Sequence, residues 1–369
     1  MNSFLNCFLI AFCVSCVLMP VVVRISRLLG AVSETGGRHI GKLPVGRLGG
    51  VGALLGILVA IGFELLVDPS LRVAFDGFQR QMIGLTLGLG LVAAVGFFDD
   101  IRRLPAVVKL VVQVFASILA YGLGLRISGV DLPFLDPIRL GWLSLPITVL
   151  WIVGIVNAVN LIDGLDGLAG GVLLFASIVN FAAAIGSGSV MPAAIMVSMA
   201  GSILGFLLFN CYPAKIYLGD GGAYSLGFLL AVCGLLAPVQ KVSTGISLLV
   251  PLLAVGLPVF DTLLTMLRRF LNRRGIFSPD RGHLHHILLD AGISHQRVVF
   301  GLYSISCVLC SSALIIVLRR NQSVGYILIA ASIFGCFIWG FSVKIQLRKA
   351  ISRVINSGSD LASRKLDDN

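Results

Sequence analysis

The segment from residue 157 to residue 168 carries polar side chains at every third position of an otherwise apolar stretch. These side chains belong to Asn157, Asn160, Asp163 and Asp166. On a helix this spacing places them along one face, and the Asp-Gly pairs at 163–164 and 166–167 then break the helix into a turn. The acidic start and closing glutamate of an EF-hand calcium loop are missing. Packing alone rarely buries two amides and two acids together, so the pattern predicts a functional site.

Two further segments combine acids with small or aromatic residues. Asp99 and Asp100 end an apolar run, and adjacent acids ionise together only where a cation offsets their charge. A helix end that meets water is the alternative, and the two residues alone leave both open. The segment 210–222 sets Asn210, Tyr217 and Asp220 beside glycines, which let a backbone approach phosphate closely. An ordinary tight turn is the alternative there.

Basic residues and histidines gather in two other segments. Three of the five histidines, His283, His285 and His286, lie within four residues and close to Arg281. An HExxH pattern and nearby cysteines are missing, which disfavours zinc, and histidines among arginines suit an anion such as pyrophosphate. A positively charged loop would explain the arginines but not the histidines. The basic, glycine-rich segment that begins at Lys42 either contacts phosphate or simply turns.

Taken together, these segments offer carboxylates for a divalent cation and cationic side chains for phosphates. Mg²⁺ binds through one or two carboxylates and completes its shell with substrate phosphates and water. Phosphoryl transfer needs mainly positioning and charge neutralisation. The pattern therefore favours an enzyme of phosphate chemistry.

The composition indicates whether this chemistry takes place in a soluble protein or in a membrane protein. Of the 369 residues, 57% are hydrophobic and only 12% are charged, against about 25% charged in soluble domains. So few charges exclude both a soluble two-domain protein and a disordered chain. The net charge of +11 need not indicate nucleic acid, because membrane proteins collect basic residues in cytoplasmic loops. We expect an all-α, polytopic integral membrane protein whose one substrate is a lipid-linked phosphate.

Apolar runs of about 20 residues predict membrane spans. Eleven are expected, at 3–23, 47–67, 81–98, 106–125, 140–160, 168–186, 191–209, 223–238, 245–267, 297–318 and 323–341. The first run has no basic residue before it, so we expect it to remain as an anchor rather than to be cleaved. The expected organisation is a single transmembrane catalytic domain at 1–341 and a basic, then polar, cytoplasmic tail at 342–369.

The basic residues predict the orientation of these spans. The loops after every odd-numbered span, together with the tail, hold 21 of the 28 lysines and arginines. The positive-inside rule places that side in the cytoplasm, with the N-terminus outside and the C-terminus inside. Asp99, Asp100, Asp163, Asp166, Asp220 and Asp261 all fall on the same side. We therefore expect a catalytic cleft formed by cytoplasmic loops.

Four motifs in this order resemble a known family. Asp99-Asp100, NxxNxxDGxDGL at 157–168, NxYPAKxxxGD at 210–220 and HLHH at 283–286 are similar to the polyprenyl-phosphate N-acetylhexosamine-1-phosphate transferases of glycosyltransferase family 4. The WecA-like branch matches best, and MraY is a relative. The resemblance implies transfer of an N-acetylhexosamine-1-phosphate, with N-acetylglucosamine preferred, from its UDP-sugar to undecaprenyl phosphate. The products would be the lipid-pyrophosphoryl sugar and UMP, with Mg²⁺, or alternatively Mn²⁺, as cofactor.

The resemblance also implies roles for individual residues. Asp99 looks like the base or positioner for the lipid phosphate, Asp220 like the metal ligand, and Tyr217 like the ring that stacks on uracil. The residues carried over form a catalytic set of Asp99, Asp100, Asp163 and Asp166, a substrate-binding set of Lys42, Asn157, Asn160, Asn210, Tyr217, Arg281, His283, His285 and His286, and the metal ligand Asp220. One departure is Ala223, where the family pattern GDxGS has serine.

The implied setting is the inner membrane of a bacterium, at the start of O-antigen or other cell-envelope polysaccharide synthesis. An ion-coupled transporter is disfavoured, because its acids should lie near the bilayer midplane on broken helices of repeated halves. The peptide-bearing substrate of MraY is a weaker alternative. The choice among N-acetylglucosamine, N-acetylfucosamine and N-acetylquinovosamine stays open, as does a homodimer.

Overall fold

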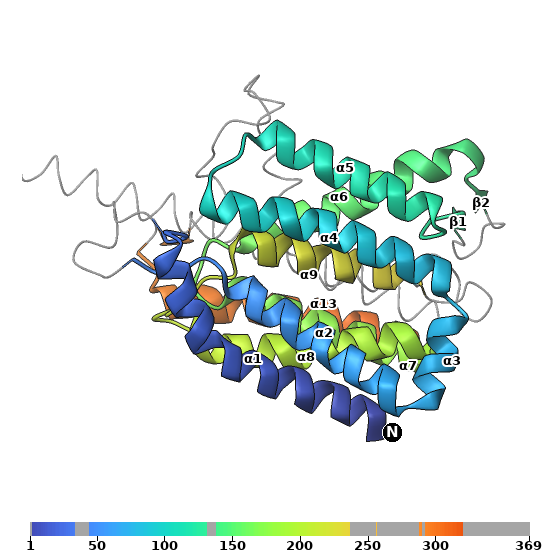
Figure 1. Ribbon diagram of the computed structural model, residues 1–369, viewed down its shortest axis with the longest axis horizontal. Helices are drawn as coiled ribbons and strands as arrows, with labels where there is room; N and C mark the ends of the chain where they lie inside the picture. The colour runs from blue at the N-terminus through green and yellow to red at the C-terminus, as the bar shows by residue number, and fades with distance from the viewer. Residues whose placement is uncertain are drawn as a thin grey trace, which may run out of the picture.

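The computed structural model describes residues 2–33, 44–130, 138–236, 256, 288–289 and 292–319. Within these ranges the fold is a bundle of α-helices with one small hairpin (Figure 1). The helices are α1 (Asn2–Leu28), α2 (Gly49–Val67), α3 (Pro69–Asp76), α4 (Gln79–Ile101), α5 (Ala106–Gly122), α6 (Ser144–Ile162), α7 (Leu168–Gly186), α8 (Val190–Asn210), α9 (Gly219–Leu235) and α13 (His295–Arg319). Strands β1 (Gly129–Val130) and β2 (Ile138–Arg139) pair antiparallel, and a 3₁₀ turn, η1 (Gly141–Leu143), precedes α6.

Nine of the eleven predicted spans fall on helices. Among the described residues, seven helical segments are long and apolar enough to cross a membrane, whereas α5 and α9 are apolar but have 17 residues each. The range 323–341 lies outside the described residues, and so does 245–267 except for Gly256. Large apolar side chains on the bundle surface, such as Leu58, Phe63 and Phe115, are exposed, as expected for helices that face lipid. The short helix α3 was not anticipated.

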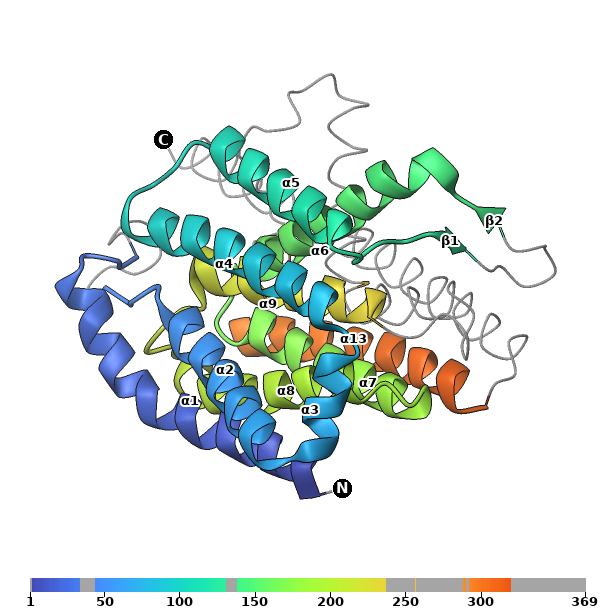
Figure 2. The ribbon, with the colours of Figure 1, turned by 45° about the vertical axis from the view of Figure 1, so that its right-hand side comes forward.

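Helix α9 lies at the centre of the bundle. It packs against α4 and α6 on one side and against α2, α7 and α8 on the other, as Figures 1 and 2 show. Tyr224 and Phe228 of α9 and Phe206 of α8 are among the largest fully buried side chains. A helix that is apolar all round belongs in such an interior position. The polar first turn of α9 is therefore held by neighbours on all sides.

Glycines allow the neighbouring helices to approach that first turn. A Cβ on Gly96 of α4 would lie 2.5 Å from the Cα of Gly221, and a Cβ on Gly50 of α2 would collide with Gly222. Small residues at such crossings are the usual device of membrane helix packing. The contacts fix the start of α9 between α2 and α4.

The helix ends that carry the conspicuous polar residues lie at one end of the bundle, at the left in Figure 1. They are the C-termini of α4, α6 and α8 and the N-termini of α2, α5, α7, α9 and α13. Isolated bridges from Gly46 to Val32 and to Ile216 tie the connecting loops together at this end. The alternation of helix directions agrees with the predicted grouping of the loops on a single side.

Candidate active site

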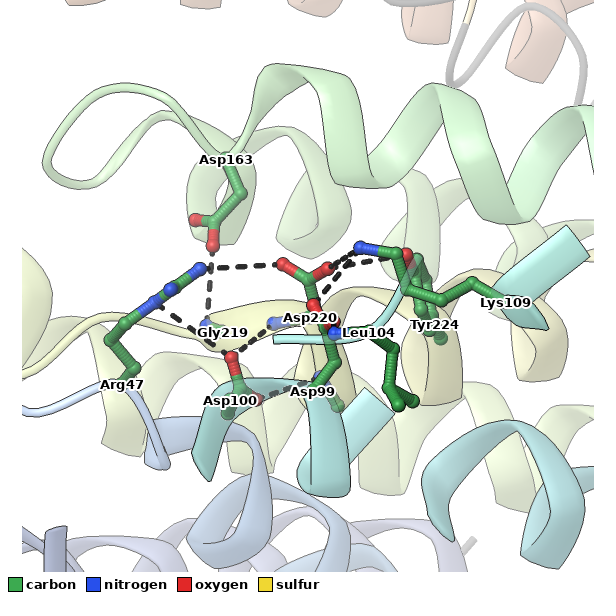
Figure 3. A network of polar contacts seen from close by, with 10 residues as sticks. Arg47, Asp99, Asp100, Leu104, Lys109, Asp163, Gly219, Asp220 and Tyr224 are labelled. Atoms are coloured by element: carbon green, nitrogen blue, oxygen red, sulfur yellow. Dashed lines mark hydrogen bonds and ion pairs between the residues drawn. The ribbon is translucent and has the colours of Figure 1, made fainter. Parts of the chain in front are cut away.

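Asp100, near the end of α4, caps the N-terminus of α9. Its Oδ1 accepts the backbone N–H of Asp220 and its Oδ2 accepts that of Gly221, both at 2.9 Å. The residue before α9, Leu218, provides no side-chain cap, so the carboxylate of another helix satisfies these donors. The side chain of Asp100 is 0% exposed. Both of its oxygens are thus used to hold the turn that presents Asp220 (Figure 3).

Gly219 makes this capping contact possible. Its φ of +78° is left-handed, and a Cβ there would lie 2.6 Å from Asp100 Oδ2 and would also collide with the carbonyl of Arg47. Any other residue would be strained in conformation and would displace the carboxylate. The Gly-Asp pair at 219–220 therefore positions an acid at a helix N-terminus.

Lys109 joins the carboxylates of two helices. Its Nζ lies 2.9 Å from Asp99 Oδ2 and 2.9 Å from Asp220 Oδ2. Asp99 Oδ1 accepts the backbone N–H of Leu104 at 2.6 Å, and the Tyr224 hydroxyl donates to Asp220 Oδ2 at 3.2 Å. Figure 3 shows these groups directed toward one another from α4, α5 and α9.

Arg47, in the loop before α2, is the second cation of the cluster. Its Nη2 lies 3.5 Å from Asp220 Oδ1 and its Nε lies 3.8 Å from Asp100 Oδ1. Of the two alternatives left open for the paired acids, the described residues agree with the one in which cations offset their charge. Because Asp163 also points into the cluster, the acids outnumber the two cations, and the site favours additional positive charge.

Asp163 and Asp166 lie after the end of helix α6, which carries the earlier residues of the polar pattern at 157–168. Helix α6 ends at Ile162, and Asp163 Oδ2 accepts the backbone N–H of Gly219 at 3.2 Å. Burial, followed by the charges of Asp220 and Asp100, raises the pKa of Asp163 well above its usual value. Asp166 Oδ2 accepts the N–H of Ala214 at 3.0 Å. Both acids therefore brace the loop between α8 and α9.

The two asparagines of the same segment lie earlier, within α6. Asn157 does not share the direction of the acids: its Nδ2 donates to Gln113 Oε1 of α5 at 2.6 Å and to the Val153 carbonyl at 2.8 Å. Asn160 is half-buried one turn before Asp163. The single polar face expected for 157–166 is thus divided between a contact with α5 and contacts with the loop after α8.

Asn210 and Tyr217 bound that loop. The buried Asn210 accepts the Gly167 N–H through Oδ1 at 3.0 Å and donates to the Ile216 carbonyl through Nδ2 at 2.8 Å. Tyr217 donates its backbone N–H to Gly46 at 2.7 Å. Burial, together with Asp166 and Asp163, raises the pKa of the Tyr217 phenol. Asn210 thus holds loops together, and its expected contact with uridine stays a prediction.

The start of α13 reaches the same region. His295 Nε2 lies 3.3 Å from the Asp166 carbonyl oxygen, and its ring stacks on Tyr212 with centroids 4.7 Å apart. The peptide bond between Tyr212 and Pro213 is cis. Six of the acidic or basic residues expected near the site lie outside the described residues: Lys42, Asp261, Arg281, His283, His285 and His286.

Three functional candidates were missed in the sequence. Lys109 lies inside the predicted span 106–125 but was given no role, although a lone lysine in an apolar helix is itself a signal that it pairs with acids. Arg47 belongs to the basic, glycine-rich segment that begins at Lys42, and neither it nor Tyr224 was given a role of its own. Their partners are distant in the sequence, so only the folded helices bring them together.

The donor groups suit a hard divalent cation. In the part of the chain that the structure describes, no three His, Cys, Asp or Glu side chains form a complete metal cage. Asp99 and Asp220 nevertheless converge on one ammonium group, and Mg²⁺ requires only one or two carboxylates when phosphates and water complete its shell. The oxygen donors therefore fit Mg²⁺ and do not fit a zinc site.

Comparisons with known proteins agree with this geometry. The family described as "Glycosyl transferase family 4" matches residues 82–237. The chain is 33% identical over 310 residues to the "Probable undecaprenyl-phosphate N-acetylglucosaminyl 1-phosphate transferase" of Bacillus subtilis (strain 168), covering 84% of each protein. It is 35% identical over 309 residues to the "Decaprenyl-phosphate N-acetylglucosaminephosphotransferase" of Mycobacterium tuberculosis (strain ATCC 25618 / H37Rv), covering 77% of this chain and 75% of that one.

A third relative is more distant. The "Phospho-N-acetylmuramoyl-pentapeptide-transferase" of Halalkalibacterium halodurans is 29% identical over 319 residues, covering 80% of this chain and 92% of that one. The family match begins within α4 and extends through α9. It therefore includes Asp99, Asp100, Lys109, Asp163 and Asp220.

Proposed function

The chain belongs to glycosyl transferase family 4, and on that premise we propose that it transfers N-acetylglucosamine-1-phosphate from UDP-N-acetylglucosamine to undecaprenyl phosphate. The products are undecaprenyl-pyrophosphoryl-N-acetylglucosamine and UMP. The observation that carries this function is the cluster of Asp99, Asp220 and Lys109, which lies within the family match. The N-acetylglucosamine enzymes match at 33% and 35% identity over about 310 residues, whereas the pentapeptide enzymes are either 29% identical or match over a shorter stretch of 254 residues, and this favours the simple hexosamine.

The reaction exchanges one pyrophosphate bond for another. An oxygen of the lipid phosphate attacks the phosphorus that bears the sugar, a new P–O–P linkage forms, and the bond to UMP breaks. A phosphate monoester has a second pKa of about 6, so the lipid phosphate is largely ionised at neutral pH. The main requirement is therefore to hold two anionic substrates together, rather than to remove a proton.

Lys109 and Arg47 supply positive charge that can hold the two anionic substrates together. Both lie against Asp220, and both carry several N–H donors suited to phosphate oxygens. Asp99 positions Lys109, and Asp100 positions the turn that carries Asp220. When bound, Mg²⁺ would be held by Asp220 with Asp99 and would neutralise charge on the pyrophosphate.

The location follows from the substrates and from the charges. We propose a bacterial plasma membrane protein whose site opens to the cytoplasm, where UDP-sugars are made. The product would begin a cell-envelope polysaccharide such as O-antigen. The preference for N-acetylglucosamine over N-acetylfucosamine or N-acetylquinovosamine rests on the names of the relatives, and a homodimer stays a prediction.

Purified protein in detergent tests the proposal directly. With undecaprenyl phosphate and Mg²⁺, we expect UMP release from UDP-N-acetylglucosamine. Release from UDP-N-acetylmuramoyl-pentapeptide should be at least about tenfold lower, a selectivity that the loss of one contact in a binding pocket can produce. Asp220→Asn should abolish release. Asp76→Asn, an exposed acid at the end of α3, is the matched control and should leave it intact. Full activity in Asp220→Asn, or no lipid product from any UDP-N-acetylhexosamine, would refute the assignment.

A further inference from the structure

A single ammonium group fills the gap between the carboxylates of Asp99 and Asp220. Lys109 Nζ lies 2.9 Å from Oδ2 of each acid, so the two oxygens are separated by no more than twice that distance. The acids come from α4 and α9. Without a shared cation, the two negatively charged carboxylates at these helix ends would repel each other.

Both carboxylates are held in orientation by groups other than Lys109. The Leu104 N–H fixes Asp99 Oδ1 at 2.6 Å, and the Tyr224 hydroxyl donates to Asp220 at 3.2 Å. Leu104 N–H is a backbone donor, and Tyr224 is buried within α9. Lys109, in contrast, reaches the gap through a flexible four-carbon stem. Arg47 also reaches Asp220, at 3.5 Å; among the closer contacts, the ammonium alone sits on a flexible stem.

A divalent cation and this ammonium compete for the same two oxygens. A Mg²⁺ ion bound by both would lie about 2.1 Å from each. Lys109 Nζ lies 2.9 Å from each of them, so the ion and an undisplaced ammonium would be at most about 5 Å apart, where like charges repel in a half-buried site. Binding of the ion between these acids therefore favours displacement of Lys109.

We propose that Lys109 and Mg²⁺ are alternative occupants of the gap between Asp99 and Asp220. This inference rests on the proposed function, which supplies both the ion and the phosphates. Lys109 has three N–H donors and no acceptor, so after displacement its next partner is a phosphate oxygen of a bound substrate. Lys109 is thus a positioning residue that stabilises the carboxylates before the ion binds and is free to hold substrate afterwards.

Thermal unfolding of the purified full-length protein, with EDTA or with increasing Mg²⁺ and without substrate, tests this exchange. In EDTA we expect Lys109→Met to melt below the wild type, because its two carboxylates lose their shared cation. Lys109→Arg should restore much of that loss, since a guanidinium can also bridge two acids. With Mg²⁺ the melting temperature of Lys109→Met should rise toward that of the wild type.

The Mg²⁺ concentration that gives half of the stabilisation should fall about tenfold in Lys109→Met, because a competing cation has been removed. Arg102→Met removes an equal charge from an exposed side chain at the end of α4 and should leave that concentration unchanged. The inference is overturned if Lys109→Met stays equally destabilised with and without Mg²⁺, or if Arg102→Met produces the same gain. In either case UMP release by the wild type would still support the proposed function. If Mg²⁺ stabilises neither protein, the inference and the proposed metal site fail together.

Discussion

Adjacent acids at one helix end perform different tasks when they face different neighbours. Asp99 and Asp100 follow each other in α4, yet Asp100 is bonded to two backbone N–H groups of α9 while Asp99 holds the Lys109 ammonium. Their order in the sequence predicted a shared role, because no pattern distinguishes the two positions. Only the placement of α9 shows that one acid caps a neighbouring helix and the other binds an ammonium.

This division predicts a larger loss of stability for Asp100→Asn than for Asp99→Asn. Asp100→Asn keeps one acceptor oxygen but leaves a buried N–H of α9 without its partner, at a cost of about 1–3 kcal/mol. Asp99→Asn keeps the bond to Leu104 and should unfold within about 1 kcal/mol of the wild type. Both should lose UMP release. Thermal unfolding in detergent beside the activity assay makes the comparison, and equal melting temperatures for the two variants would contradict it.

Asp163 provides a pH-dependent prediction at the same scale. Its pKa is raised by burial and by Asp220 and Asp100, so ionisation of this group opposes folding. The stability associated with the protonated acid is present at low pH and is lost as the pH rises through the raised value. Asp163→Asn keeps an acceptor for the Gly219 N–H and carries no charge.

We therefore expect Asp163→Asn to melt above the wild type at high pH, with the difference shrinking as the pH falls below the raised pKa. Melting curves across a pH series in matched detergent measure this difference. A constant difference at all pH values would indicate that the charge of Asp163 is not responsible.

At the scale of the element, most of the bundle was predictable because apolar runs of span length form helices in any membrane setting. The errors lie where tertiary contacts decide. The span predicted at 223–238 begins instead at Gly219, because Asp100 caps a segment whose glycines alone indicate a turn. The predicted span 106–125 contains Lys109, and helix α5 confirms it; what the sequence does not show is that the acids of α4 and α9 make a cation acceptable there. The sequence shows Gly219 and Lys109 but not which helices pack beside them, and those helices determine the local structure.

The crossing of α4 and α9 predicts a sharp contrast between two glycines of α4. Gly96→Ala would place a Cβ 2.5 Å from the Gly221 backbone, whereas a Cβ on Gly90 meets nothing within 4 Å. Overpacking of this kind costs about 1–3 kcal/mol, and the displaced helix would carry the Asp100 cap away from Asp220. Gly96→Ala should therefore lose both stability and activity.

Gly90→Ala is the matched control on the same helix. It should be neutral or slightly stabilising, by up to about 1 kcal/mol, because alanine favours the helix over glycine. The melting temperature and UMP release of Gly96→Ala and Gly90→Ala measure this contrast. Equal behaviour of the two would indicate that the close approach of α4 and α9 does not position the site.

At the scale of the whole molecule, the site and the excess of positive charge share one end of the bundle. Arg47, Arg102 and Lys109 lie at the end that carries the acids, whereas Arg72 and Arg80 lie near the opposite helix ends. The positive-inside rule assigns the acid-bearing end to the cytoplasm, and the same assignment places the site where a UDP-sugar is available. The charge rule and the proposed UDP-sugar substrate thus predict the same orientation.

That orientation predicts which engineered thiols a membrane-impermeant maleimide reaches. In a variant without native cysteines, Arg102→Cys marks the site end and Asp76→Cys marks the opposite end, and both positions are exposed. In intact spheroplasts we expect labelling of Asp76→Cys alone, and of Arg102→Cys only after the membrane is permeabilised. The reverse pattern would place the carboxylate cluster outside the cell. A cytoplasmic UDP-sugar could not reach it there, so the proposed reaction requires the predicted pattern.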